Sequence, residues 1–103
     1  MVHKIIWSPR ALEDLREIVR YIRRDNPTAA KRFGEQLIER AENLAAFPER
    51  GRVIPKFADP TIRDILFRNY RIAYRIRNDS PHDPRVEIAR IWHGARDESG
   101  LTL

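Results

Sequence analysis

The segments YRIAYRI (residues 70–76) and VEIARIWHGAR (residues 86–96) decide the fold of this chain. Both are rich in β-branched and aromatic residues, which favour β-strands. The segment NDSPHDP (residues 78–84) lies between them and consists almost entirely of turn-forming residues. We therefore expect two antiparallel strands, at residues 70–77 and 85–92, joined as a hairpin.

The first of these strands alternates between apolar and basic residues. One set is Tyr70, Ile72, Tyr74 and Ile76, and the other set is Arg71, Ala73, Arg75 and Arg77. Because successive side chains of a strand point to opposite faces, the arginines are expected to face away from the core. Arginine grips phosphate or carboxylate through two N–H groups, so this face is either an ordinary solvated surface or a site for an anionic partner. That partner would be nucleic acid or an acidic protein.

The second strand carries apolar residues on both faces. Its two sets are Val86, Ile88, Arg90 and Trp92, and Glu87, Ala89, Ile91 and His93. The pattern does not decide which set faces inward, and it is typical of a central strand. In a central strand, Arg90 is expected to extend its charged end to solvent or to pair with an acid.

Two capping signals predict two helices in the first half of the chain. Ser8-Pro9 begins one helix and Asn26-Pro27 begins the next, because Ser and Asn side chains cap helices and Pro suits the first position. Apolar residues then recur at spacings of three and four, which predicts one buried face for each helix. These residues are Leu12, Leu15, Ile18, Val19 and Ile22, followed by Ala30, Phe33, Leu37, Ala41 and Leu44. The short connection makes the pair an antiparallel hairpin that ends before Pro48.

Further strands are expected at residues 3–7 and 62–68, and the Pro-rich residues 48–60 predict an ordered loop. The predicted fold class is therefore α+β, with elements in the order β-α-α-β-β-β. We expect a small antiparallel sheet with the helical hairpin packed on one face and the other face open. Residues 1–103 are expected to form a single domain.

The composition narrows the possible partners and sites. Lys and Arg number 20 against 15 Asp and Glu, and the resulting net charge of +5 favours polyanionic partners. The chain has no cysteine, which excludes disulfides and thiolate metal sites and fits a cytoplasmic location. No apolar run is long enough for a membrane span, so no membrane contact is expected. Without ligand spacing among the histidines or a phosphate-binding glycine loop, neither a metal nor another cofactor is expected.

Five segments, taken in order, resemble the RelE/ParE toxins of bacterial type II toxin–antitoxin systems. They are residues 7–15 (WSPRALEDL), 26–30 (NPTAA), 47–51 (FPERG), 70–74 (YRIAY) and 92–96 (WHGAR). The resemblance spans nearly the whole chain and implies a compact sheet with a helical hairpin. It also implies growth inhibition, a role in plasmid stabilisation and a cognate antitoxin as partner.

The resemblance leaves three activities open. ParE-like members poison DNA gyrase, RelE-like members cut mRNA on the ribosome, and a degenerate toxin would retain only antitoxin binding. We expect the ParE-like activity. The residues expected to bind the target or the antitoxin are Arg71, Arg75, Arg77, Arg90 and Arg96.

The nuclease alternative implies a catalytic set of Arg71, Glu49 and His93. A ribose 2′-OH would attack the adjacent phosphate, Glu49 or His93 would move protons, and Arg71 would stabilise the developing charge. Gly94 departs from nuclease members of this type, which often carry an aromatic residue after the histidine. The structural interpretation of Glu49 is a loop carboxylate paired with Arg50 or Arg52.

Overall fold

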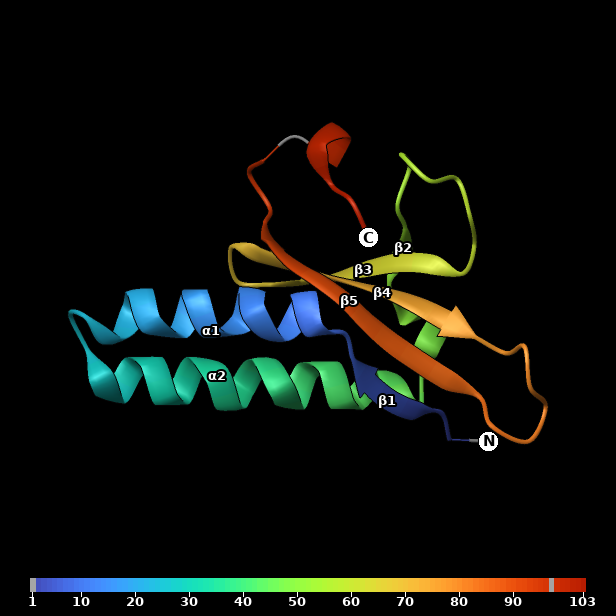
Figure 1. Ribbon diagram of the computed structural model, residues 1–103, viewed down its shortest axis with the longest axis horizontal. Helices are drawn as coiled ribbons and strands as arrows, with labels where there is room; N and C mark the ends of the chain where they lie inside the picture. Colours follow the sequence, from blue (N-terminus) through green and yellow to red (C-terminus); the bar gives the residue numbers. More distant parts are fainter. Residues whose placement is uncertain (1, 97) are drawn as a thin grey trace.

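The computed structural model describes residues 2–96 and 98–103, and its two helices pack against one five-stranded sheet (Figure 1). The strands are β1 (Lys4–Trp7), β2 (Arg52–Val53), β3 (Ile62–Phe67), β4 (Tyr70–Arg77) and β5 (Arg85–His93). The helices are α1 (Pro9–Arg23) and α2 (Pro27–Glu42), with short 3-10 turns at Asn43–Ala45, Pro48–Arg50 and Glu98–Gly100. The expected α+β class is confirmed. Within the described residues, no helix has the length and apolar character needed to cross a membrane.

The sheet has the strand order β1-β5-β4-β3-β2. Strands β3, β4 and β5 pair antiparallel in succession, as expected. Strand β1 instead pairs in parallel with β5, so the sheet is mixed. The helical hairpin carries the chain from β1 at one edge to β2 at the other, and β3, β4 and β5 then bring it back beside β1. The short strand β2 forms inside the predicted loop and covers only the first half of β3.

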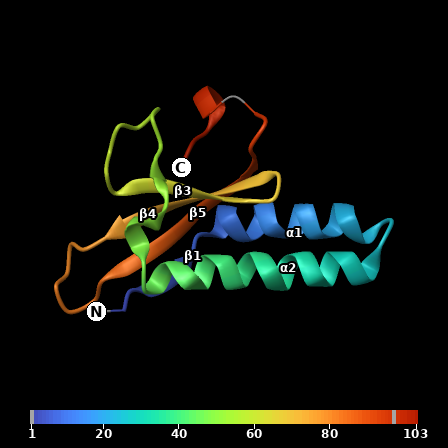
Figure 2. The same cartoon turned by 180° about the vertical axis from the view of Figure 1, so that it is seen from behind.

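Both helices begin where the capping residues predict. The Ser8 Oγ accepts a hydrogen bond from the Ala11 N–H, and the Asn26 Oδ1 accepts one from the Ala29 N–H, each over 3.0 Å. The hairpin lies along one face of the sheet, and its turn projects beyond the sheet at one end of the molecule (Figures 1 and 2).

The main core lies between the hairpin and the sheet. The helices and the 3-10 turn after them contribute Ala11, Phe33, Leu37, Ala41 and Leu44, and the sheet contributes Phe67, Ile72, Tyr74, Val86, Ile88 and Ile91. All eleven are buried, which removes a large apolar area from water and is the main driving force for folding. Ile72 and Tyr74 therefore face the helices, as the alternation of β4 predicts.

A bulge at Ala89 explains the two-sided pattern of β5. Ala73 pairs with Arg90 and Tyr74 pairs with Ile88, which leaves Ala89 as an extra residue. The extra residue reverses the alternation, so Val86 and Ile88 pack on the hairpin before the bulge and Ile91 does so after it.

The start of α1 holds this bulge in place. The Ser8 Oγ donates to the Ala89 carbonyl over 2.9 Å. The Asp14 carboxylate accepts from Arg90 Nε over 2.8 Å and from the Ile91 N–H over 2.9 Å. The bulge is thus built into the packing of α1 against the sheet.

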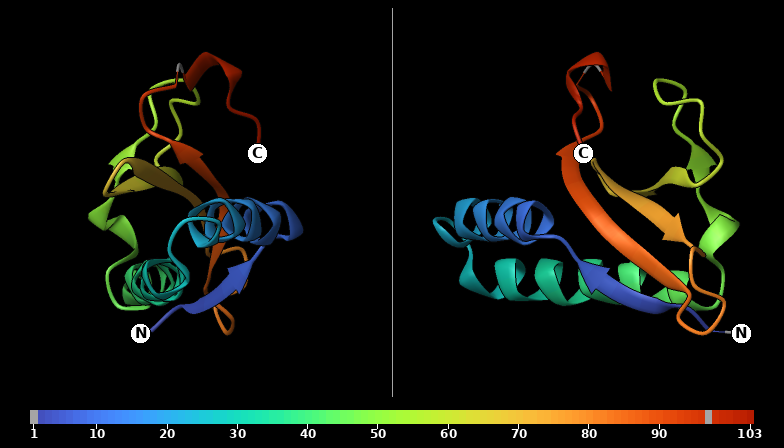
Figure 3. Two further views of the ribbon diagram at one scale, coloured as in Figure 1. Left: turned by 90° about the vertical axis from the view of Figure 1, so that its left-hand side faces the viewer. Right: turned by 45° about the vertical axis from the view of Figure 1, so that its right-hand side comes forward.

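The opposite face of the sheet is not open, contrary to expectation. A second apolar cluster covers part of it, formed by Ile54, Ala73, Trp92 and Leu101 with Phe57, Ile62 and Leu103 at its margin. The C-terminal residues fold back over this face, on the side away from the helices (Figure 3). The Lys56 ammonium donates to the Ser99 carbonyl over 2.7 Å and to the Leu101 carbonyl over 2.5 Å, which fixes the returning chain. Leu101 and Leu103, near the end of a polar C-terminal segment, supply the apolar side chains that cover this face of the sheet.

Candidate functional site

Arg75 and Arg77 project from β4 on the face opposite the hairpin. Both lie near the carboxylate of Glu87 on β5, at 3.7 Å and 3.5 Å respectively. Two guanidinium groups therefore share one acid at the partly exposed end of the sheet. Such long, solvated pairs are weak and exchange readily with other anions.

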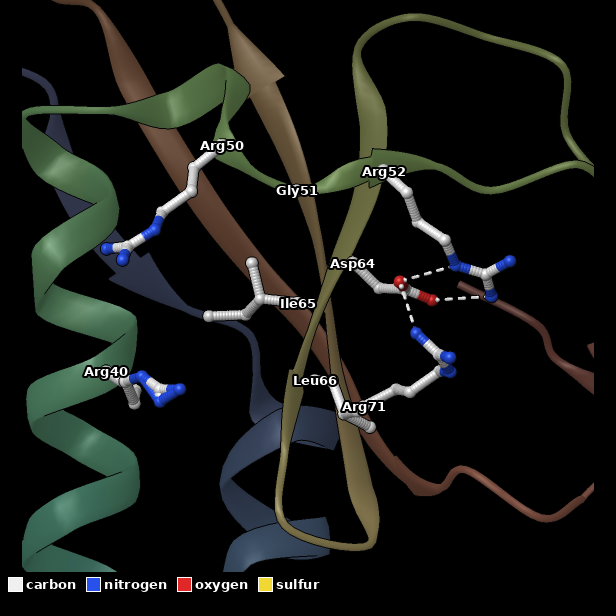
Figure 4. Close-up of a pocket in the computed structure, with 8 residues that line it drawn as sticks. All are labelled: Arg40, Arg50, Gly51, Arg52, Asp64, Ile65, Leu66 and Arg71. Carbon is white, nitrogen blue, oxygen red and sulfur yellow. Dashed lines mark hydrogen bonds and ion pairs between the residues drawn. The ribbon is translucent and has the colours of Figure 1, made fainter.

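Arg71 projects from the same face and belongs to a buried ion-pair cluster. The Asp64 carboxylate on β3 is only 1% exposed and accepts from Arg71 Nη1 over 3.1 Å. It also accepts from Arg52 Nε over 2.9 Å and Arg52 Nη2 over 3.2 Å (Figure 4). The hydrogen bond to Asp64 raises the pKa of the Arg52 guanidinium above its ordinary value. Arg71 therefore has a structural role as well as an exposed charge.

Arg90 is also paired inside the molecule. Its Nε donates to Asp14 over 2.8 Å, and its Nη1 donates to the Thr102 carbonyl over 3.1 Å. Arg96 differs, because it lies after the end of β5 with its side chain exposed. Of the five arginines expected to bind a partner, four thus have a carboxylate neighbour.

The sequence interpretation missed the acids that neutralise the arginine face. Asp64, Glu87 and Asp14 each lie opposite an arginine across a strand or helix contact. A signal was present for Asp64, because an acid in the middle of the apolar segment 62–67 requires a cationic partner if it is buried. Asp14 gave no such signal, since it lies on a helix rich in charges.

His93 lies on the hairpin side of the sheet at the end of β5. Its ring contacts Tyr70 with centroids 5.4 Å apart, and Tyr70 in turn packs edge-on against Phe33 of α2. The Ala95 N–H donates to His93 Nδ1 over 3.2 Å, so the neutral ring carries its proton on Nε2. His93 also lines a hollow of about 380 Å³ beside α1 that it shares with Arg96.

The segment 47–51 is fixed by Tyr74. The buried Tyr74 hydroxyl donates to the Pro48 carbonyl over 2.6 Å and accepts from the Gly51 N–H over 2.9 Å. Burial raises the pKa of this hydroxyl above its ordinary value. A Cβ at Gly51 would lie 2.5 Å from the Asp64 carbonyl, so only glycine fits.

Glu49 lies on the outer side of this segment, where its side chain is exposed. The expected pairing with Arg52 does not form, because Arg52 binds Asp64 and Glu98 instead. No ion pair joins Glu49 to Arg50 among the described residues. Glu49 lines a separate hollow with Phe47 and Arg50.

The three residues of the nuclease set are therefore not brought together. Arg71 and His93 project from opposite faces of the sheet, and Glu49 lines a hollow that includes neither of them. Gly94, which follows His93, lies close to the Arg71 side chain. Its N–H donates to the Asn69 carbonyl over 2.7 Å, and a Cβ there would lie 3.3 Å from that oxygen and 3.6 Å from Arg71 Cγ. An aromatic residue at this position would require the turn to move.

A metal centre is not indicated by the described residues. Their His, Asp and Glu side chains include no group of three or more with the arrangement of a metal site.

Comparisons with known proteins agree with this fold. Residues 5–98 match the family described as "ParE toxin of type II toxin-antitoxin system, parDE". The chain is 38% identical over 94 residues to "Toxin RelE2" of Caulobacter vibrioides, covering 90% of this chain and 97% of that protein. It is 32% identical over 98 residues to "Toxin RelE1" of the same organism, covering 91% and 96%. A solved structure, "Chromosomal ParDE TA system from P. aeruginosa", shares the fold with a TM-score of 0.71 at 20% identity, over 89% of this chain and 96% of that one.

Proposed function

The chain belongs to the ParE family, the toxins of type II toxin–antitoxin systems, and from this premise we propose that it arrests bacterial growth by inhibiting DNA gyrase. The toxin would act on this macromolecular target in the cytoplasm, and its action would involve no nuclease chemistry. Residues 1–103 act as one toxin domain, and a cognate antitoxin neutralises it and contributes to plasmid stabilisation.

The observation that carries this proposal is the separation of the nuclease candidates. General acid–base catalysis requires the proton donor or acceptor to lie within hydrogen-bond reach of the reacting group. Arg71 and His93 lie on opposite faces of the sheet, and His93 Nδ1 already accepts a backbone N–H.

A RelE-like mRNA endonuclease is the second candidate. It is favoured by the similarity of the chain to the Caulobacter proteins named Toxin RelE1 and Toxin RelE2. It is also favoured by the register of β4 and β5, in which His93 pairs with Tyr70, the residue before Arg71.

Two assays separate the candidates. The purified chain should stall gyrase-dependent supercoiling and leave cleaved DNA, while mRNA on programmed ribosomes stays intact. If mRNA is instead cut in the ribosomal A site, the gyrase proposal is wrong. In that case His93→Ala should slow cleavage by about two orders of magnitude, whereas the loop variant His82→Ala should not.

The degenerate alternative is tested by growth. Induced expression of the chain alone should arrest bacteria, and co-expression of the antitoxin should relieve the arrest. Normal growth with soluble, folded protein would leave antitoxin binding as the remaining function.

For the antitoxin we propose the sheet face that carries Arg75 and Arg77. These two guanidinium groups share Glu87 through long contacts, so acidic groups of the antitoxin can compete for them. The variant Arg75→Gln/Arg77→Gln should bind the antitoxin more weakly and with a shallower salt dependence. If calorimetry shows an unchanged affinity, the antitoxin binds another surface of the chain.

A further inference from the structure

The unpaired edge of β3 borders a hollow of about 380 Å³ that is rich in arginine (Figure 4). Arg40 and Arg50 lie on the α2 side of this strand, and Arg52 and Arg71 lie on the other side. Asp64 is the one acid among the described residues that line the hollow, and it is already engaged by Arg52 and Arg71. Arg52 also pairs with Glu98 outside the hollow, so four guanidinium groups are balanced by two carboxylates, which leaves an excess of two positive charges.

Arg40 and Arg50 take part in no ion pair among the described residues, although Glu39, Glu42 and Glu49 are close to them in the sequence. Arg40 stacks on the Phe67 ring at 5.8 Å, which orients its guanidinium without neutralising it. The arginines of the sheet face, by contrast, have acid partners. The edge hollow therefore retains charge that is free to bind an anion.

The backbone of β3 adds a donor to this hollow. The Ile54 N–H donates to the Ile62 carbonyl, and Arg52 pairs with Asp64, so alternate residues of β3 direct their N–H to this edge. The next such residue is Leu66, which lines the hollow. Its partner would be Arg50, whose N–H instead donates to the Phe47 carbonyl as the chain turns away.

The excess of donors favours a phosphate over a carboxylate. A phosphate presents more acceptor oxygens and more negative charge to guanidinium groups that approach from several directions. An adjoining hollow of about 670 Å³ shares Arg50 and is lined by Phe47, whose side chain is 66% exposed. An exposed aromatic ring beside a cationic group is the arrangement on which nucleobases stack.

We propose that these two adjoining hollows form a nucleotide site, with the phosphate between Arg40, Arg50 and the Leu66 N–H and the base against Phe47. The ligand is a free nucleotide or one unit of a single-stranded nucleic acid. The site requires no catalysis and does not depend on whether gyrase is the target.

The test measures binding of the purified chain to inorganic phosphate, to a mononucleotide and to a fluorescent single-stranded oligonucleotide. Arg40→Gln and Arg50→Gln should each weaken nucleotide binding about tenfold. Phe47→Ala should weaken nucleotide and oligonucleotide binding but leave phosphate binding unchanged. Tighter binding of the oligonucleotide than of the mononucleotide assigns the site to nucleic acid, and equal binding assigns it to free nucleotides.

Arg24→Gln is the matched control, because it removes one charge from an exposed position at the end of α1. The proposal would be overturned if Arg40→Gln and Arg50→Gln weaken nucleotide binding no more than Arg24→Gln does. Net charge alone would then explain the binding. Glu49→Gln should raise affinity, because it removes the acid that lines the base hollow. In NMR spectra of the unmodified chain, adding nucleotide should shift the Nε resonances of Arg40 and Arg50. Resonances that do not shift would likewise overturn the proposal.

Discussion

Arginine occurs in two different settings in this molecule. On the sheet face, Arg71, Arg75 and Arg77 each lie beside an acid from a neighbouring strand. At the edge of β3, Arg40 and Arg50 lie near several acids in the sequence, but neither forms an ion pair with any of the described residues. Charge counted along a strand therefore overstates the charge available to a partner. The predictions below test whether Arg71, which pairs with a buried acid, supports the fold, and whether Arg40 and Arg50 carry charge that is free to bind a partner.

Replacing Asp64 should have the largest effect on stability. Asp64→Asn keeps the shape but leaves Arg52 and Arg71 without their buried acid, at a cost of about 3 kcal/mol in the free energy of unfolding. For a domain of this size the midpoint of thermal unfolding should fall by about 15 °C. Urea and thermal unfolding measure both quantities. A midpoint within a few degrees of the parent would mean that the cluster does not hold the fold.

Tyr74→Phe should cost about 2 kcal/mol, because the buried Gly51 N–H loses its acceptor. The variant also tests a pH dependence. Burial raises the pKa of Tyr74, so its stabilising contribution is complete below the unfolded value of about 10 and is lost as the pH rises above it. The free energy of unfolding should therefore fall less steeply above this pH in the variant than in the parent. Parallel pH profiles would contradict this role.

Arg71→Gln and Arg50→Gln compare the two settings directly. Arg71→Gln should cost about 1–2 kcal/mol, since Arg52 still partners Asp64, whereas Arg50→Gln should stay within about 0.5 kcal/mol. Both substitutions remove one charge, so each is the control for the other in urea unfolding. Equal losses would remove the distinction between paired and free arginines.

Arg75→Gln should have the smallest effect, within about 0.5 kcal/mol, because its contact with Glu87 is long and solvated and Arg77 remains. Thermal unfolding at low and high salt checks this value. A loss above about 1 kcal/mol that disappears in high salt would show that this pair supports the fold.

Local signals were enough to predict most of the fold. Ser8-Pro9 and Asn26-Pro27 mark the helix starts because capping depends on neighbouring residues only. The alternation in β4 placed its arginines on the correct face for the same reason, since a regular strand has a period of two.

The remaining features depend on contacts between distant segments. The bulge at Ala89 is held by Ser8 and Asp14, and the cover of the second sheet face by Leu101 is held by Lys56. Neither relation leaves a periodic signal in the sequence. The arginine face could be located from the sequence, but its neutralising acids, Asp64 above all, required the strand register.

Growth arrest by two charge-matched double variants tests the central claim most directly. Arg40→Gln/Arg50→Gln and Arg75→Gln/Arg77→Gln each remove two positive charges, and immunoblotting with circular dichroism would confirm equal amounts of folded protein. If the unneutralised charge of Arg40 and Arg50 contributes to toxicity, the first variant should no longer arrest growth. The second variant, whose arginines are proposed to bind the antitoxin, should arrest growth like the parent. Full toxicity of the first variant together with loss in the second would contradict the account.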